Sequence, residues 1–407
     1  MSAVVPEHFA APPDATAERV YQRVLSISLG MLGFFLLFST AGTAIFMFVL
    51  LLLALAAPQR FWRAVPWRDP VVVSSLLLIA YVALRTLFEE GFSAATLKAT
   101  NHYHELLMLP LLYGLMRMSR RPQWFINGLL MSVLALCVLA WLAPFNINAW
   151  EFMNRRRISA GFGLAVCAFL VFEHTRLGHM PRAQGYPIAA FLAATIIFTG
   201  QGRTGQLVLL LLVGCATFRG LRGRRRLPLT LAALLLALAV AGLSPPVRER
   251  MAETWQALET TKSSLEPNST AGRLEILHNA LGVAREHWLL GTGWPEYPDA
   301  LRQMSARRHG VPASVYGAIS DNPHDEYLLQ LGAGGLPALL LFLLWLASPM
   351  WRAWKERAAP QPWTGAVACV AVSFAVAALF NSLLLDWIEA HFYVALLAWL
   401  LARRTQD

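Results

Sequence analysis

The chain has 407 residues, of which 57% are hydrophobic and only 14% are charged. This composition excludes an ordinary soluble domain and is typical of a protein that crosses a membrane many times. The net charge of +10 falls mostly in short basic segments between hydrophobic runs, so it indicates membrane orientation. We therefore expect membrane lipids, and no nucleic acid, as partners.

Hydrophobic stretches long enough for one membrane crossing recur along almost the whole chain. They predict an all-α polytopic membrane protein with about twelve transmembrane helices and one large helical loop. Residues 1–243 hold helices one to nine, 244–325 hold the loop, and 326–407 hold the last three helices. The expected spans are 25–39, 41–57, 70–87, 100–118, 124–142, 159–172, 186–199, 204–218, 227–243, 326–347, 364–385 and 391–401.

Basic residues mark every second gap between these spans. Arginine or lysine follows each even-numbered span, and five arginines lie between Arg219 and Arg226. Because cations are retained on the cytoplasmic side, both termini are expected in the cytoplasm and the loop 244–325 outside. Residues 1–24 show no cleavable signal peptide, so the first span is expected to direct its own insertion.

The loop is expected to contain two amphipathic helices. The first opens at Pro245, and the second carries an apolar stripe from Leu274 to Trp288 and stops at Gly291-Thr292-Gly293. A turn-rich segment, 263–272, separates them. Residues 294–321 are expected to be irregular, and a helix that starts at 321–324 is expected to continue into the tenth span.

Some cations lie where the charge rule predicts few. Arg155, Arg156 and Arg157 follow the fifth span on the expected external side, so an anion is expected to compensate them. Lipid head groups are one such anion, and a phosphate-bearing substrate is the other.

Arg203 stands at the start of the eighth span, against the positive end of a helix, which is unfavourable by roughly 0.3–1 kcal/mol. A cation held beside an amide-rich helix end is typical of an anion site, although an interfacial arginine would occupy the same position. Arg273 repeats this arrangement in the loop. Two such arginines suit a pyrophosphate, since each guanidinium matches phosphate oxygens.

His324 is expected at the second position of a helix. The helix dipole disfavours its charged form there, so a neutral imidazole is available to accept a proton from a hydroxyl. The simpler alternative is a capping or packing residue. His102 and His104 are two residues apart and point to different faces of a helix, so no metal site is expected from them.

Four short motifs follow one another between residues 200 and 345. They are Gly202-Arg203-Thr204-Gly205-Gln206-Leu207, Ala271-Gly272-Arg273-Leu274 with Leu289-Leu290-Gly291-Thr292-Gly293, Asn322-Pro323-His324-Asp325-Glu326-Tyr327-Leu328, and Leu331-Gly332-Ala333-Gly334-Gly335-Leu336. With about twelve spans and one late external loop, the chain resembles the bacterial O-antigen ligase and polymerase family.

This resemblance implies a GT-C-like membrane glycosyltransferase of the bacterial inner membrane, with its active site on the periplasmic side. It implies an O-antigen ligase that transfers polysaccharide from undecaprenyl pyrophosphate to a lipid A-core sugar hydroxyl in lipopolysaccharide biosynthesis, without a metal or other cofactor. Arg203 and Arg273 would then contact the pyrophosphate, and His324 would be the catalytic base. Asp325 departs from the asparagine that often follows this histidine in the family.

Other functions fit parts of the same sequence. A polymerase of the same repeat units or a protein O-oligosaccharyltransferase would share the motifs and differ in the acceptor. A secondary transporter with twelve spans is the alternative outside the enzymes. Carriers usually place ionisable residues at the middle of the membrane, whereas Arg85, Glu105 and Asp386 lie near span ends.

Overall fold

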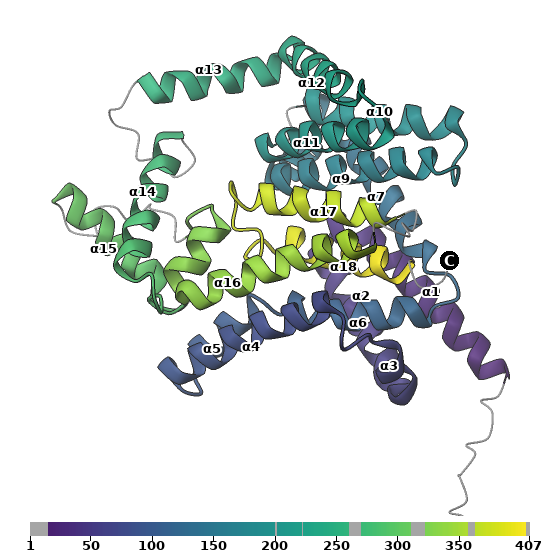
Figure 1. Cartoon of the computed structure of the whole chain (residues 1–407), viewed down its shortest axis with the longest axis horizontal. Helices are drawn as coiled ribbons and strands as arrows, with labels where there is room; N and C mark the ends of the chain where they lie inside the picture. The colour runs from purple at the N-terminus through teal and green to yellow at the C-terminus, as the bar shows by residue number, and fades with distance from the viewer. Residues whose placement is uncertain are drawn as a thin grey trace, which may run out of the picture.

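The computed structural model describes residues 15–199, 202–221, 223–259, 270–310, 322–356 and 363–403. Within these ranges the chain is all-α, as predicted, and Figure 1 shows the helices gathered around α16 to α18. The elements are α1 (Ala15–Phe38), α2 (Thr40–Ala56), α3 (Pro58–Ala64), α4 (Pro70–Glu90), α5 (Ala94–Asn101), α6 (Glu105–Met118), α7 (Gln123–Leu142), η1 (Ala143–Phe145), α8 (Ile147–Arg155), α9 (Arg157–Arg176), α10 (Arg182–Phe198), α11 (Arg203–Gly220), α12 (Arg226–Leu243), α13 (Pro245–Glu259), α14 (Thr270–Glu286), α15 (Tyr297–His309), α16 (Glu326–Lys355), α17 (Thr364–Ala377) and α18 (Trp387–Arg403).

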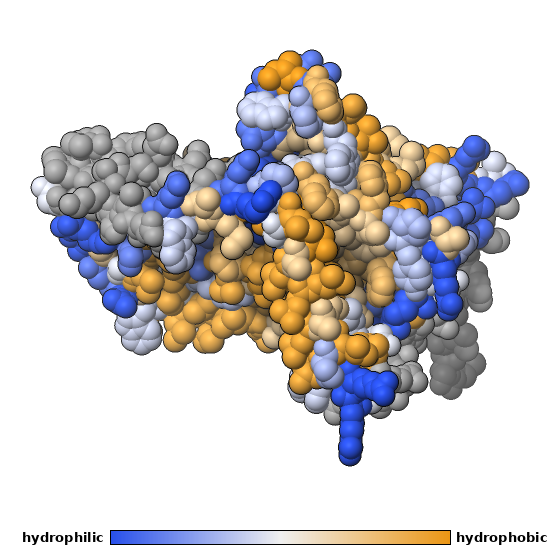
Figure 2. Space-filling view, turned by 90° about the horizontal axis from the view of Figure 1, so that it is seen from above, coloured by the Kyte–Doolittle hydropathy of each residue, from blue (hydrophilic) through white to orange (hydrophobic). Residues whose placement is uncertain are grey.

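Six described helices, α1, α4, α7, α9, α12 and α16, are long and apolar enough to cross a membrane alone. Helices α2 and α3 form a pair bent by 104°, which gives up to seven candidate spans. Every predicted span overlaps a helix, but the helices other than these are too short or too polar to count by themselves, and α17 has 14 residues. Figure 2 shows hydrophobic side chains across the middle of one face, as a multi-pass membrane protein requires.

The expectation of an irregular segment at 294–321 is wrong over much of its length. Tyr297–His309 is the helix α15, which ends at Gly310 in a left-handed conformation, φ 67°. Its buried residues Tyr297, Leu301 and Met304 recur at helical spacing. The charged residues between them make this short apolar stripe hard to recognise in the sequence. Residues 311–321 and most of the predicted turn at 263–272 lie outside the described residues.

The predicted start of the helix that enters the tenth span is also corrected. Asp325 is the N-cap of α16, because its side chain accepts the Leu328 N–H at 2.9 Å. His324 has a φ of 52°, which is left-handed and incompatible with a helix. His324 therefore precedes the helix, and the helix-dipole argument for its neutral form does not apply.

Helices α9 and α11 pack so closely that their backbones touch. A Cβ atom at Gly205 would lie 2.5 to 2.7 Å from the backbone of Gly161. The Gly202 N–H donates to the Arg157 carbonyl at 3.1 Å, which ties the starts of the two helices together. This packing sets Arg157 and Arg203, the first residues of α9 and α11, side by side.

Helix α16 is broken at Gly335, where φ is 71° and ψ is −169°. The turn 288–293 fills the break: the N–H groups of Thr292 and Gly293 donate to the carbonyls of Gly332 and Ala333 at 2.9 and 2.8 Å. The Leu336 N–H donates in return to the Trp288 carbonyl at 2.8 Å. The motifs 289–293 and 331–336 of the sequence therefore pair through these hydrogen bonds. The contact anchors α14 and α15 to α16.

We expect the Gly205→Ala variant to be less stable than the wild-type protein, by about 1–3 kcal/mol, because its Cβ meets backbone that cannot rotate away. Gly214→Ala in the same helix is the matched control, since its Cβ comes no closer than 3.4 Å to the Leu234 side chain. Thermal unfolding of the two variants in detergent measures the difference. Equal unfolding temperatures would contradict the close packing of α9 on α11.

Candidate functional site

Three arginines gather where three helices begin. Arg157 and Arg203 are the first residues of α9 and α11, and Arg273 lies in the first turn of α14. Burial lowers the pKa of the Arg273 guanidinium, and the positive charges of Arg203 and Arg157 lower it further. The three side chains therefore lie within electrostatic reach of one another. Such a concentration of positive charge at helix N-termini favours a bound anion.

The structure separates Arg157 from the two arginines before it. The Arg155 side chain is 79% exposed and lies 3.9 Å from Glu151. The Arg156 guanidinium lies over the Phe152 ring, 4.2 Å from its centroid. Both side chains thus engage residues of α8, whereas Arg157 is grouped with Arg203 and Arg273.

His324 is held by hydrogen bonds on both sides. Its backbone N–H donates to Oδ1 of Asn322 at 2.9 Å, and its Nδ1 lies 3.3 Å from Oδ1 of Asn381. The Asn381 amide nitrogen donates to the Asp386 carboxylate. Because Oδ1 of Asn381 can only accept, Nδ1 of His324 must carry the proton, and Nε2 keeps a free electron pair. The left-handed backbone of His324 is the one positive φ among the described non-glycine residues and is typical of a functional position.

Electrostatics near His324 favour the neutral imidazole. Burial lowers its pKa, the positive charge of Arg273 lowers it further, and the hydrogen bond with Asn381 opposes them. The neutral form expected from the sequence thus has a different cause from the helix dipole. Burial also raises the pKa of Asp386 to about 6. His324 and Arg273 therefore lie within electrostatic reach of each other.

A buried polar network fixes the start of α16 next to His324. The Glu326 N–H donates to the Ala378 carbonyl at 2.8 Å, and the Glu326 carboxylate accepts the Leu384 N–H at 2.9 Å. Gln330 joins this carboxylate to the Tyr103 hydroxyl, with distances of 2.8 and 2.9 Å. The connection between α17 and α18 is therefore pinned where Asn381 meets His324.

Asn381 is a site residue that the sequence analysis missed. The predicted span 364–385 treats it as part of a membrane helix, whereas α17 ends at Ala377. A signal was present, since Asn381, Ser382 and Asp386 interrupt an apolar run. Polar residues of this kind in a membrane segment mark an irregular backbone that is buried in protein.

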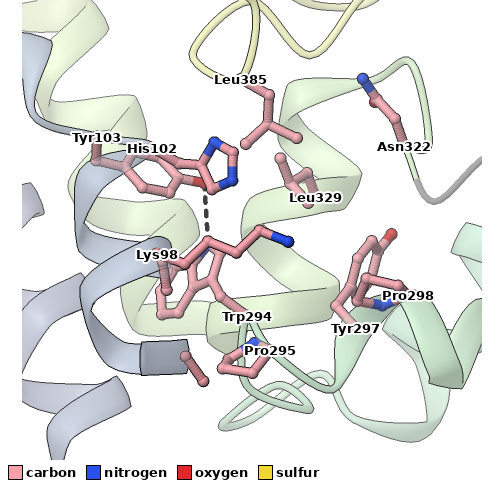
Figure 3. A pocket seen from close by; sticks show the side chains of 12 residues that line it. Lys98, His102, Tyr103, Trp294, Pro295, Tyr297, Pro298, Asn322, Leu329 and Leu385 are labelled. Carbon is pink, nitrogen blue, oxygen red and sulfur yellow. Dashed lines mark hydrogen bonds between the residues drawn. The ribbon is translucent and has the colours of Figure 1, made fainter. Parts of the chain in front are cut away.

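A cavity of about 390 Å³ is lined in part by Asn322, two residues before His324 in the chain (Figure 3). Asn322, which accepts the His324 N–H, forms part of its wall, and Lys98 and His102 line it from α5 and the turn that follows. In Figure 3 the Trp294 indole donates to the Tyr103 hydroxyl, at 2.9 Å. The residues lining the cavity include aromatic rings and polar groups, a combination that suits a small organic ligand. None of the arginines above is in this lining.

Comparison with known proteins finds a family match for the central part of the chain. Residues 188–343 match the family described as O-antigen ligase. The matched range includes Arg203, Arg273 and His324, and it excludes Arg157, Asn381 and Asp386. No curated protein matches the chain. Over residues 188–343 the chain thus carries a domain similar to the O-antigen ligase family, which covers both ligases and polymerases.

Proposed function

We propose that the protein is an O-antigen ligase that transfers polysaccharide from undecaprenyl pyrophosphate to a sugar hydroxyl of lipid A-core. The observation that carries this proposal is the grouping of Arg157, Arg203 and Arg273 with a neutral, oriented His324. A polar site of this kind beside long apolar helices suits a substrate with a charged head and an isoprenoid tail. The proposed location is the inner membrane, with the site on its periplasmic side and both termini in the cytoplasm.

The arginines are proposed to bind the pyrophosphate and to stabilise it as it leaves. When the bond between the sugar anomeric carbon and the pyrophosphate oxygen breaks, negative charge grows on the phosphate oxygens. Cationic groups that are already in position lower the barrier to this step, by roughly 2.7–4 kcal/mol for one good donor. Arg203 and Arg273 take this role, and Arg157 adds to the same positive field.

His324 is proposed to activate the acceptor. Its Nε2 takes the proton of the acceptor hydroxyl while the hydroxyl oxygen forms the new bond to the anomeric carbon. Asn381 and Asp386 are positioning residues in this proposal, because they hold the proton of the imidazole on Nδ1. The cavity beside Asn322 is proposed to receive a sugar unit, since Trp294 and Tyr297 offer aromatic surface there.

The acceptor is tested by transfer with the purified protein and an undecaprenyl-pyrophosphate-linked glycan. Lipid A-core, a second lipid-linked glycan and a protein acceptor are offered in separate reactions. A ligase gives product only with lipid A-core. Elongated lipid-linked glycan would identify a polymerase, modified protein would identify a protein O-oligosaccharyltransferase, and either result would replace the ligase assignment.

We expect Arg203→Ala and Arg273→Ala each to lower kcat by about 10²–10³-fold, the usual effect of removing one donor to a developing anion. Lysine at either position should rescue poorly, because it replaces a planar fork by a point charge. Arg155→Ala is the matched comparison, since its side chain is 79% exposed, and it should cause a smaller loss that depends on salt. Full activity in both lysine variants would contradict phosphate binding through the guanidinium fork.

His324→Ala should lower transfer by about 10²–10⁴-fold, as expected on removal of a general base, while the lipid-linked donor still binds. In the wild-type protein the neutral base is lost as the pH falls through the pKa of His324, which lies below 6.5. The acid limb of kcat/KM should therefore lie below pH 6.5. A variant without His324 that keeps a large part of the activity would exclude the base role.

The Asn381→Ala variant tests whether Asn381 positions the His324 imidazole or only stabilises the fold. The hydrogen bond with Asn381 raises the pKa of His324, so its removal should move the acid limb to lower pH. At the same time kcat should fall, because the imidazole loses its fixed orientation, and the KM for the donor should change little. A lower kcat with an unmoved acid limb would indicate that Asn381 has only a structural role.

A further inference from the structure

A second group of ionisable side chains lies where the start of α6 meets α18. One potential ligand atom from each of His104, Glu105 and His391 lies within 4.8 Å of the others. The ring centroids of His104 and His391 are 4.9 Å apart. Glu105 and His391 are buried, with 1% and 3% of their surface exposed. The proposed transfer reaction uses none of these three residues.

Both histidines are oriented by backbone carbonyls. Nδ1 of His104 lies 2.6 Å from the Asn101 carbonyl oxygen, and Nδ1 of His391 lies 2.7 Å from that of Trp387. Because a carbonyl oxygen only accepts, each ring carries its proton on Nδ1 and keeps a free electron pair on Nε2. The Trp387 ring also stacks on His391 at 3.9 Å and fixes the plane of its imidazole. A carbonyl on one ring nitrogen and a free electron pair on the other are typical of metal-binding histidine.

Glu105 is the third potential ligand. Its Oε1 atom is buried and has no hydrogen-bond partner among the described residues. Its Oε2 atom lies 3.5 Å from Nδ1 of His104, whose proton is directed to the Asn101 carbonyl. A buried carboxyl that is charged in a protein is paired with a cation or coordinates a metal, and otherwise it takes up a proton, because an uncompensated charge away from water is very unfavourable. The unpartnered oxygen thus points to a ligand, independently of the histidines.

We propose that His104, Glu105 and His391 bind one divalent cation of the zinc class. Two imidazoles and one carboxylate are ligands that Zn²⁺ accepts, whereas Mg²⁺ and Ca²⁺ require mostly oxygen ligands. Three protein ligands leave one position for water. The cation would join the start of α6 to His391, the fifth residue of α18, just after the connection that holds Asn381 and Asp386. This site is separate from the proposed pyrophosphate site, and its test does not depend on transfer activity.

The experiment measures bound metal on the full-length protein, purified in detergent through a tag without histidine. The protein is stripped with EDTA, dialysed against Zn²⁺ with excess Mg²⁺, and analysed for both metals. We expect about one zinc per chain, and a spectrum of a four- or five-coordinate ion when Co²⁺ replaces it. Glu105→Gln and His391→Ala should reduce the retained zinc to near zero. His102→Ala is the matched control, since it removes a histidine from the same turn but outside the cluster, and it should retain the zinc.

Two results would overturn the proposal. One is a wild-type protein that retains no zinc after dialysis, and the other is equal retention by the wild-type protein, Glu105→Gln and His391→Ala. Size-exclusion elution in detergent verifies that the variants are folded. Glu105→Gln preserves the shape of the side chain. If His391→Ala fails to fold, zinc retention by Glu105→Gln and the Co²⁺ spectrum of the wild-type protein still decide whether the site binds zinc.

Discussion

The hydrogen bonds between the turn 288–293 and the break in α16 hold the two parts of the site together. Without them, Gly332, Ala333 and Leu336 would have unpaired backbone groups inside an apolar helix, where each costs several kcal/mol. Helix α4 completes the pairing, because the Tyr81 hydroxyl donates to the Gly334 carbonyl at 2.7 Å. Since α14 leads into this turn and His324 directly precedes α16, the same contact sets Arg273 relative to His324.

The fold holds several positive charges close together at the site although they repel one another. Burial lowers the pKa of Arg273, and repulsion from Arg203 and Arg157 lowers it further. The backbone contact of α9 with α11 and the anchoring of α14 prevent them from separating. A scaffold that keeps like charges together has positioned them before any anion arrives, and pre-organisation of this kind is the main source of electrostatic catalysis. Burial lowers the pKa of His324, and the positive charge of Arg273 lowers it further.

Much of this fold follows from hydropathy and local capping signals, and the departures have physical causes. Helix α15 was missed because charged residues surround its buried stripe, and the start of α16 was misplaced because Asn322 and Asp325 are both good N-cap types. Arg203 and Arg273 stood out in the sequence through their position at helix starts. Asn381 did not, because its importance depends on a contact with His324 from a distant part of the chain. The pairing of His104 with His391 was invisible for the same reason, and periodicity gave no sign of it.

The break in α16 also has a consequence for the order of biogenesis. The turn 288–293 precedes α16 in the chain, so it is synthesised before the helix whose broken backbone it completes. Helix α16 cannot satisfy its own N–H and C=O groups near Gly335, and lipid offers no substitute for them. The membrane insertion of α16 is therefore linked to the prior folding of the segment before it. A deletion within that segment would damage the span itself, and would leave the chain exposed to quality control before any substrate is met.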